Sequence, residues 1–342
     1  MNRRKCGRFE LELPVLGIGC WAFGGGSYWG DQSQRDVDEV VSAAIDLGAN
    51  FFDTAEGYNE GESEISLGKA LKGRRHSAII ASKISPGNTD PDTLRAHCDA
   101  TLKRLATDYL DIYMIHWPIS DRSVTPRQGR LPSLRDALEA LRRLKREGKI
   151  RYIGLSNFGV KQLGEVLDLG GEIVVDELAY NLLSRAIERD ILPACEQNGI
   201  GVVGYSALMQ GILSGKYQSM DEIPSNRTRT RHFRGDRPES RHGGPGAEAE
   251  TWAALSAIRN IATDSGEPME RIALAWSVAN PLITCTLAGA RNRSQVEENV
   301  RGAEIELRPE VVKALSEAGR TLDETLGGNA DYYQSDEGSR IW

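Results

Sequence analysis

Residues 50–116 read NFFDTAEGYNEGESEISLGKALKGRRHSAIIASKISPGNTDPDTLRAHCDATLKRLATDYLDIYMIH, and this stretch decides the fold. Three short apolar runs, 50–54, 78–83 and 110–116, are predicted strands, and the segments 64–71 and 93–105 between them have helical spacing. The apolar runs are nearly continuous, which is typical of strands that are buried on both faces of a parallel sheet. The stretch therefore predicts parallel strands that are joined by helices.

The same alternation continues on both sides of this stretch. Further strands are predicted at 15–20, 152–156, 173–177, 202–206 and 283–288, and further helices at 35–47, 134–149, 160–167, 187–197 and 295–303. The chain thus has eight strand–helix units. Eight units favour an α/β fold in which the sheet closes into a (β/α)8 TIM barrel, over an open doubly wound sheet. We expect a single barrel domain over residues 1–342, because no linker-like segment divides the chain.

Several segments lie outside the predicted repeat. Extra helices are expected at 251–262, 269–278 and, near the C-terminus, 309–322, and a small hairpin at 9–13 beneath the barrel. Residues 219–247 are polar, rich in arginine and glycine, and without periodicity. They predict one long loop after strand seven, on the face that carries the active site in such barrels.

The composition restricts the classes of function. The 342 residues carry a net charge of −7, so neither nucleic acid nor an anionic membrane is the expected main partner. No apolar run approaches the ~20 residues of a membrane span, and the basic N-terminal segment lacks the apolar core of a secretory signal. The histidines and five scattered cysteines form no ligand pattern, so we expect reduced cysteines, no protein-bound metal and a cytoplasmic protein.

Residues 17–22, GIGCWA, match the GxGxxA fingerprint of dinucleotide-binding folds. That fingerprint needs a helix that begins inside the motif, so that the helix N-terminus meets the pyrophosphate. Residues 23–26, FGGG, follow instead, and they prevent a helix from beginning there. The motif therefore indicates the end of a strand and a glycine-rich loop, not a Rossmann site.

Ionisable side chains follow three successive predicted strands. The first of these strands ends in Asp53, the next in Lys83 and the third in His116, and Tyr58 lies in the loop after Asp53. Neighbouring strands are ~4.8 Å apart, so these side chains can converge at the C-terminal rim of a barrel. Any one of them alone would be an ordinary strand end or cap, but four in register predict an active site.

The chemistry of this group favours proton transfer. A phenol has a pKa of about 10, and a neighbouring Lys83 ammonium is expected to lower the pKa of Tyr58 toward ~7–8. Asp53 would hold Lys83 charged and in place, and His116 would hydrogen-bond a carbonyl oxygen. The group then supplies a proton to a developing alkoxide, which is the partner that a hydride donor needs.

These residues and their surroundings resemble the aldo-keto reductase superfamily. The matching segments are DTAEGY (53–58), ASK (81–83), DYLD (108–111) with HWP (116–118), GLSNF (154–158), YNLLSR (180–185), YSAL (205–208) and GAR (289–291) through Glu298 and Asn299. They extend over residues 16–302, which is nearly the whole chain. The pattern resembles the bacterial branch that includes inositol-type dehydrogenases, and it is similar to potassium-channel β subunits.

The resemblance implies an enzyme that reduces aldehydes or ketones to alcohols, or runs the reverse reaction, with NADP(H) and a tetrad of Tyr58, Asp53, Lys83 and His116. Tyr58 is the implied proton donor. Ser156 and Asn157 would hold the nicotinamide carboxamide, and Tyr205 would stack on the ring. The other implied cofactor contacts are Gly19, Cys20, Trp21, Asp53, Ser206, Leu208, Gly211, Gln295, Glu298 and Asn299. The implied substrate pocket is shaped by Trp21, Tyr58, His116 and Trp117.

Two positions bear on the cofactor. The family usually has glutamine where this chain has Glu177, and a carboxylate cannot donate to the carboxamide unless it is protonated. Arg291 opens the last helix at a position where relatives contact the phosphate on the adenosine ribose. A guanidinium can bind that phosphate through two hydrogen bonds, so we expect NADP(H) to be preferred over NAD(H).

Other functions fit less well. Asp53 and Glu56 could be the carboxyl pair of a glycosidase, but such an enzyme has no use for Lys83. The arginine-rich segment 225–242 could bind RNA, although a lid over an anionic cofactor better suits an acidic protein. The main alternative is a cofactor-binding, redox-sensing regulatory subunit with little turnover. The expected partner is a small carbonyl or alcohol, and the sequence leaves a homo-oligomer open.

Overall fold

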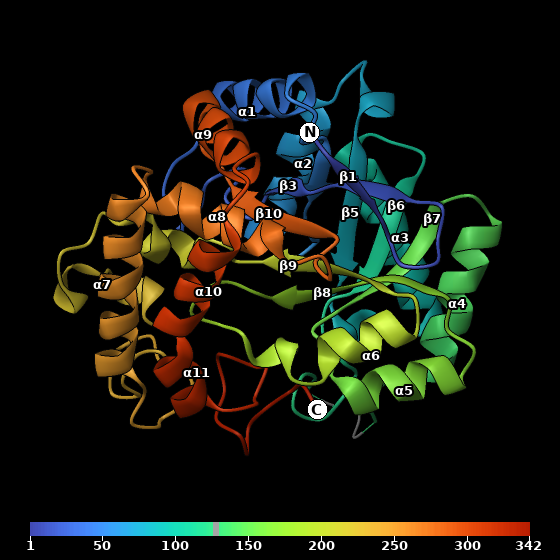
Figure 1. Cartoon of the computed structure of the whole chain (residues 1–342). Coiled ribbons are helices and arrows are strands. Elements are labelled where there is room, and N and C mark those ends of the chain that lie inside the picture. Colours follow the sequence, from blue (N-terminus) through green and yellow to red (C-terminus); the bar gives the residue numbers. More distant parts are fainter. Residues whose placement is uncertain (126–129) are drawn as a thin grey trace.

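The computed structural model describes residues 1–125 and 130–342, and its centre is a closed barrel of parallel strands (Figure 1). The strand order around the barrel is β10-β3-β4-β5-β6-β7-β8-β9, and these strands are β3 (Leu16–Gly19), β4 (Phe51–Asp53), β5 (Ile79–Ile84), β6 (Leu110–Ile115), β7 (Ile150–Ser156), β8 (Ile173–Ala179), β9 (Gly201–Tyr205) and β10 (Cys285–Gly289). Each pair follows chain order, and β10 closes the ring against β3. The predicted (β/α)8 barrel is confirmed.

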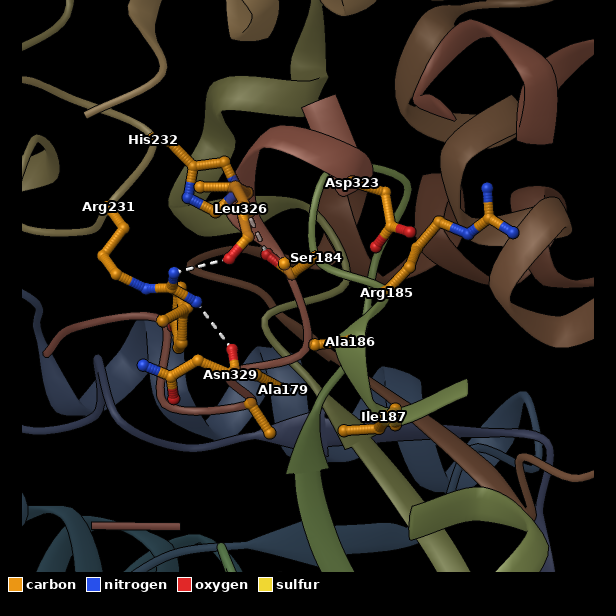
Figure 2. Close-up of a pocket in the computed structure, with 13 residues that line it drawn as sticks. Ala179, Ser184, Arg185, Ala186, Ile187, Arg231, His232, Asp323, Leu326 and Asn329 are labelled. Atoms are coloured by element: carbon orange, nitrogen blue, oxygen red, sulfur yellow. Dashed lines mark hydrogen bonds between the residues drawn. The ribbon is translucent and has the colours of Figure 1, made fainter. Parts of the chain in front are cut away.

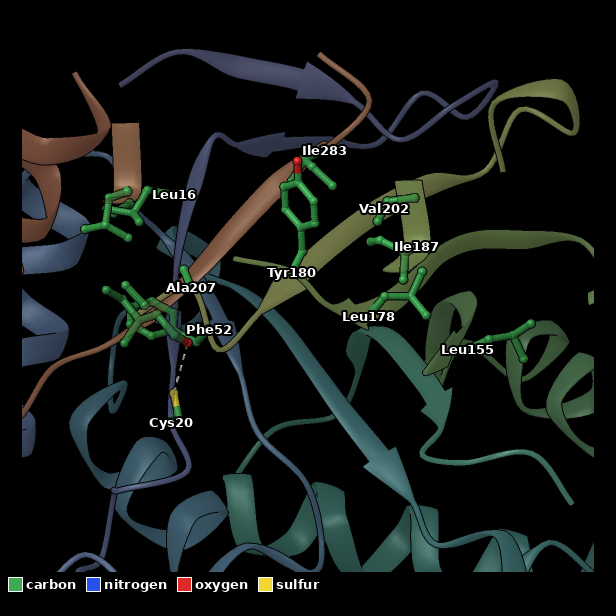
Figure 3. Close-up of a cluster of buried hydrophobic side chains, with 14 of the residues drawn as sticks. Leu16, Cys20, Phe52, Leu155, Leu178, Tyr180, Ile187, Val202, Ala207 and Ile283 are labelled. Atoms are coloured by element: carbon green, nitrogen blue, oxygen red, sulfur yellow. Dashed lines mark hydrogen bonds between the residues drawn. The ribbon is translucent and has the colours of Figure 1, made fainter. Parts of the chain in front are cut away.

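The barrel has an inner and an outer apolar layer. The interior is filled by large side chains such as Phe51, Met114 and Leu287. Small residues make room for them, because a Cβ on Gly17 would lie 2.7 Å from the Phe51 ring and one on Gly154 would lie 2.7 Å from Met114. The outer layer, between strands and helices, is shown in Figure 3, with the labelled residues Leu16, Phe52, Leu155, Leu178, Tyr180, Ile187, Val202, Ala207 and Ile283 among its members.

The helices surround this barrel (Figure 1). They are α1 (Gln34–Asp46), α2 (Glu62–Ala70), α3 (Pro91–Leu105), α4 (Leu134–Arg146), α5 (Val160–Asp168), α6 (Ile191–Gln197), α7 (Glu248–Asp264), α8 (Met269–Ala279), α9 (Arg293–Ala303), α10 (Pro309–Ala318) and α11 (Arg320–Leu326). Helix α1 begins only at Gln34, after a capping box made by Ser33 and Asp36, so no helix starts in the GIGCWA motif. This confirms that the motif is not a Rossmann fingerprint.

Three predicted elements differ in the structure. Helix α8 was expected outside the repeat, but it belongs to the barrel's helix ring, because it packs against α9 and β10 and its Ser277 hydroxyl is 2.9 Å from that of Thr286. The predicted helix 309–322 is two helices, and the break falls at Gly319, where a Cβ would lie 2.8 Å from the Leu182 carbonyl oxygen. The N-terminal hairpin has its strands at β1 (Arg3–Lys5) and β2 (Glu12–Pro14), so most of 9–13 forms its turn.

Two further segments lie outside the barrel strands and the helix ring: the N-terminal hairpin and the long loop after β9. The hairpin approaches the start of β9, where Arg8 N–H donates to the Gly199 carbonyl over 2.9 Å. Residues 219–247 contain only the short 3-10 turns Met220–Glu222 and Ser225–Arg227, as expected of a long loop, and they bury Thr228, Thr230, His232 and Phe233. Across the described chain, none of the helices combines the length and apolar character that crossing a bilayer requires.

A candidate active site at the C-terminal rim of the barrel

Strands β4, β5 and β6 bring the four predicted catalytic side chains together. Lys83 is fully buried, and its ammonium donates to both Asp53 carboxylate oxygens, over 2.6 and 2.7 Å, and to the Tyr58 hydroxyl over 3.2 Å. It also donates to the Thr54 carbonyl over 3.0 Å. The Tyr58 and His116 rings meet edge to face, with centroids 5.6 Å apart. The proximity that the strand ends predicted is therefore present.

A second carboxyl group completes the buried cluster. Glu177, on β8, is 2% exposed, and its Oε1 lies 3.4 Å from the Lys83 ammonium. Its Oε2 is buried and has no hydrogen-bond partner among the described residues. One ammonium thus faces two carboxyl groups. An unpartnered buried carboxyl oxygen is costly, and the cost is smaller when the carboxyl group is protonated and uncharged.

The environment shifts the pKa of both carboxyl groups. Burial and the charge of Asp53 raise the pKa of Glu177 well above its ordinary value. Burial also raises the pKa of Asp53, although Lys83 opposes it. Two carboxyl groups beside one cation share a proton readily, since two adjacent negative charges repel one another. Asp53, with two short bonds to Lys83, is the ionised member, and Glu177 is the group that holds a proton.

The pKa of Tyr58 differs from the expectation. Burial raises the pKa of Tyr58 above its ordinary value, although the charge of Lys83 works in the opposite direction. The expected lowering toward ~7–8 is therefore wrong for this structure. The main reason is the burial of the phenol, and the negative charges of Asp53 and Glu177 beside Lys83 raise its pKa further. Tyr58 consequently keeps its proton at neutral pH and is available as an acid.

His116 and Lys83 have settled charge states. Burial, and then the charges of Lys83 and Arg340, hold the pKa of His116 well below its ordinary value. Burial disfavours the Lys83 ammonium, but Asp53 and Glu177 outweigh it and raise the pKa of Lys83. At neutral pH the imidazole is therefore uncharged and the ammonium charged. A neutral imidazole can donate one hydrogen bond to a carbonyl oxygen without competing for the proton of Tyr58.

A group of hydrogen-bonded polar residues lies beside this cluster, at the ends of β7, β8 and β9. Asn157 adopts a left-handed backbone with φ of 65°, and its amide donates to the His116 carbonyl over 3.1 Å. The Tyr205 hydroxyl donates to the Asn157 side chain over 2.8 Å, and the Ser156 hydroxyl donates to the Glu177 carbonyl over 3.1 Å. The three residues that the resemblance assigns to the nicotinamide thus lie next to one another and next to the tetrad.

The segment after β9 has unusual backbone geometry. Ser206, Met209 and Gln210 have φ of 58°, 44° and 56°, although none is glycine, and Gly211 has φ of 90°. Such conformations are strained for residues with a Cβ and concentrate at functional sites. Successive backbone N–H groups in turns of this kind can cradle an anion. Leu208 and Gly211, two more predicted contacts, lie in this segment.

The residues at the expected adenosine end form different hydrogen bonds and ion pairs within the protein. The Arg291 guanidinium donates to the carbonyls of Trp29, over 2.5 Å, and Asp31, and so holds the loop before α1. Gln295 accepts from the Arg291 backbone N–H over 2.8 Å. Asn299 donates to the Gly289 carbonyl over 3.2 Å. Glu298 is paired with Arg271 and Arg301, so its carboxylate already has cationic partners.

Two C-terminal residues that the sequence did not predict, Tyr332 and Arg340, contact residues next to the tetrad. Arg340 lies over the Trp117 ring, with Cζ 3.5 Å from its centroid, and bonds Asp331 through Nε and Nη2 over 2.7 and 2.8 Å. Tyr332 contacts Ser206, hydroxyl to hydroxyl, over 3.3 Å. The segments that resemble the family end before these residues. The only sequence feature that could have indicated a role for this segment is its cluster of aromatic residues after the last helix.

A small cavity elsewhere does not compete with this site. Figure 2 shows Arg231 there, donating to the carbonyls of Leu326 and Asn329 over 2.7 and 2.6 Å. The space is about 20 Å³, which is room for roughly one water molecule, and no tetrad residue lines it. Within residues 1–125 and 130–342, no set of His, Cys, Asp and Glu side chains could hold a metal ion. All five cysteines are buried and free.

Comparisons with known proteins agree with the fold and show the family. The model of the aldo/keto reductase family matches residues 15–320. The NADH-specific methylglyoxal reductase of Escherichia coli is 31% identical over 94% of this chain and 100% of its own, and a probable voltage-gated potassium channel subunit beta of Arabidopsis thaliana is 30% identical over 89% and 92%. A Klebsiella pneumoniae aldo/keto reductase solved with NADP and acetate has a TM-score of 0.69 and 26% identity, covering 92% of this chain and 95% of that chain.

Proposed function

Because the chain belongs to the aldo/keto reductase family, we propose that it is an NADP(H)-dependent enzyme that reduces aldehydes or ketones to alcohols, or runs the reverse reaction. The family and the relative named as a methylglyoxal reductase support an oxidoreductase. The observation that carries the proposal is the Tyr58 hydroxyl, 3.2 Å from the Lys83 ammonium and beside the neutral His116 ring.

The residues of this chain would divide the work as follows. His116 donates a hydrogen bond to the substrate carbonyl oxygen and fixes its position beside the Tyr58 hydroxyl. Tyr58 then gives its proton to that oxygen as negative charge develops, because an alkoxide is far more basic than a phenolate. Lys83 stabilises the phenolate that remains, and Asp53 keeps Lys83 in place over 2.6 Å. The raised pKa of Tyr58 does not prevent this step, since the acceptor is the stronger base.

The residues present fit a nicotinamide dinucleotide, which supplies the hydride when it is bound. Glu177 pairs with Ser156 in the register of β7 and β8, its backbone carbonyl accepts from the Ser156 hydroxyl and the Asn157 N–H, and its side chain carries a buried, unpartnered oxygen. The strained backbone after β9 offers N–H groups to a pyrophosphate. Gly19 and Gly289 pair across β3 and β10, and a Cβ on Gly19 would meet no atom closer than 4.0 Å, so the rim is open there.

A substitution at Tyr58 tests the assignment. Tyr58→Phe removes the proton donor and keeps the ring, so we expect turnover of methylglyoxal or of an aromatic aldehyde to fall by at least roughly a hundred-fold. Affinity for NADPH, measured by fluorescence titration, should change by less than about three-fold, since the hydroxyl contributes little to dinucleotide binding.

Two results would contradict the proposal. Retained turnover in Tyr58→Phe, with a ten-fold loss of cofactor affinity, would move Tyr58 from the catalytic to the cofactor site. A wild-type protein that binds NADPH but turns over none of a broad set of carbonyls would instead be the redox-sensing regulatory subunit, a function that the similarity to channel subunits makes worth testing.

A further inference from the structure

Two arginines of the loop after β9, Arg227 and Arg229, lie over aromatic rings and form no ion pair with any carboxylate that the structure describes. Arg229, in the long loop after β9, lies over three aromatic rings, with Cζ 4.5 Å from the centroid of Tyr28, 5.6 Å from Tyr333 and 5.8 Å from Trp21. Its Nε is buried, and no carboxylate in the part of the chain that the structure describes pairs with it. Arg229 is half-buried, and the aromatic rings stabilise its charge without neutralising it, so the guanidinium favours the approach of an anion.

Other arginines of the same loop are already engaged. Arg234 pairs with Asp236, and Arg237 pairs with Glu248. Arg231 donates to two backbone carbonyls of the C-terminal segment. Arg340, which lies over the Trp117 ring, is neutralised by two hydrogen bonds to Asp331. Arg229 therefore contributes a positive charge that its neighbours do not cancel.

The aromatic contacts place Arg229 on the side where a substrate enters. Trp21, which it overlies, has its ring centroid 6.0 Å from that of the proton donor Tyr58. Tyr333, on its other side, is also 6.0 Å from the Arg340 guanidinium that covers Trp117. Both tryptophans are expected to line the substrate pocket, so Arg229 lies one ring away from the reacting centre.

We propose that Arg229 binds an anionic group of the substrate, so that this enzyme prefers carbonyl compounds that carry a carboxylate or phosphate. This inference rests on the proposed reductase function and adds a substrate class to it. The aromatic rings around Arg229 fix its planar guanidinium, which can then bind a planar carboxylate through two parallel hydrogen bonds. The reacting carbonyl of the same molecule reaches Tyr58 and His116 across the Trp21 ring.

A phosphate of the cofactor is the other anion that this arginine could receive. Arg227 is the nearer candidate for that role, because it lies 3.9 Å from the centroid of Trp29, and the Trp29 backbone carbonyl is held by Arg291. Arg229 shares only Tyr28 with it. The two arginines thus divide the loop into a cofactor side and a substrate side, and the experiment separates them.

The test compares two aldehydes of similar shape, 4-carboxybenzaldehyde and the uncharged 4-nitrobenzaldehyde. In Arg229→Met we expect kcat/KM for the carboxylate to fall by roughly ten- to a hundred-fold, and kcat/KM for the nitro compound to change by less than about three-fold. Arg229→Lys keeps a cation and should retain part of the preference. Arg234→Met, an exposed arginine of the same loop, is the matched control and should leave both substrates unchanged.

Binding measurements make the test independent of turnover. 4-Carboxybenzaldehyde is titrated into the protein with and without NADP⁺, following tryptophan fluorescence, and Arg229→Met should weaken its affinity by the same factor. An unchanged preference and unchanged affinity would overturn the proposal. Equal weakening of NADPH and NADH in Arg229→Met would also overturn it and assign the arginine to a cofactor phosphate. Absence of turnover in the wild type, with carboxylate binding that depends on Arg229, would refute the reductase and leave the anion site.

Discussion

The Lys83 ammonium interacts with Glu177 as well as with the members of the tetrad. Asp53 takes two short hydrogen bonds, Glu177 lies 3.4 Å away and the Tyr58 hydroxyl accepts a third bond. Lys83 therefore does not turn Tyr58 into a phenolate at rest. Lys83 stabilises the phenolate as the proton leaves Tyr58. Stabilisation at that moment lowers the activation free energy of the reaction.

These charge states predict a flat pH profile for reduction. The pKa of His116 is lowered, so the imidazole becomes protonated only below its ordinary value of about 6.5, and the pKa of Tyr58 is raised, so the phenol ionises only above about 10. Between those limits neither group changes its charge. We expect kcat/KM for the carbonyl, measured at saturating cofactor, to vary by less than about two-fold across this range.

One result would contradict the predicted flat pH profile. A basic limb with a midpoint between about 7 and 8 would mean that bound cofactor lowers the pKa of Tyr58 strongly. The same titration in His116→Gln identifies the acidic limb, because glutamine keeps a donor and cannot be protonated.

Glu177 behaves as a neutral acid, which predicts that glutamine can replace it. Glu177→Gln keeps the shape and a donor, so we expect NADPH affinity at neutral pH to be equal or tighter. In the wild type the affinity should fall as pH rises through the raised pKa of Glu177, because the ionised form no longer donates to a carboxamide. In Glu177→Gln this dependence should disappear. NADPH fluorescence titrations from about pH 6 to 10 measure both effects, and several-fold weaker binding at neutral pH would show a role that requires the carboxylate.

At the scale of elements, the barrel strands were predictable and the segments between them less so. Apolar runs with both faces buried mark β5 and β6 in the sequence, and polar residues at their ends mark the rim, so Lys83 and His116 could be placed there. Arg229 and Arg340 could not, because their positions depend on how irregular segments pack against distant residues such as Trp21 and Trp117.

The misassigned helices have the same kind of cause. Helix α8 has a helical pattern, but periodicity does not tell whether a helix joins the ring or lies outside it. Only its contacts with α9 and β10 decide this. The break between α10 and α11 depends on a single glycine, Gly319, whose close approach to the Leu182 carbonyl is a tertiary contact. The tetrad needed no such contact, since register between neighbouring strands sufficed.

The start of α9 carries the prediction on cofactor choice. Arg291 lies just before this helix, where backbone N–H groups and the helix dipole favour an anion. Arg291→Ala should weaken NADPH by about ten- to a hundred-fold and NADH by less than about three-fold, because only NADPH carries the extra phosphate. Isothermal titration of both cofactors measures the difference.

The structure also suggests a second role for Arg291, in holding the loop before α1. Arg291 also holds the carbonyls of Trp29 and Asp31, so its loss could release the loop before α1 and weaken both cofactors alike. Arg293→Ala, an exposed neighbour paired with Glu297, is the control for the helix charge. Equal losses for NADPH and NADH would assign Arg291 to the loop, and a wild-type preference for NADH would match the NADH-specific relative.

At the scale of the whole molecule, the last residues of the chain pack beside the candidate site, where Arg340 lies over Trp117 and Tyr332 contacts Ser206. Residues 329–342 run from the end of α11 past Trp117 to the start of α5, where the Trp342 carbonyl accepts from the Lys161 backbone N–H over 3.1 Å. Arg122 donates to the Ser339 carbonyl over 2.7 Å. The terminus is thereby tied to elements that follow β6 and β7, so the shape of the substrate entrance depends on contacts far from it in sequence.

The buried Asp331–Arg340 pair holds Arg340 over the Trp117 ring, and breaking the pair should affect stability and substrate binding together. Asp331 is fully buried and bonds Arg340 through two side-chain nitrogens and its backbone N–H. Asp331→Asn leaves a largely buried guanidinium without its counter-charge, so we expect the free energy of unfolding in urea to fall by about 3 kcal/mol. Arg340 would then leave the Trp117 ring, and KM should rise while NADPH affinity stays the same. The double variant Asp331→Asn/Arg340→Met removes the unpaired charge and should recover part of the stability but not the low KM. If Asp331→Asn is as stable as the wild type, with unchanged KM, the pair neither stabilises the fold nor positions Arg340 for substrate binding.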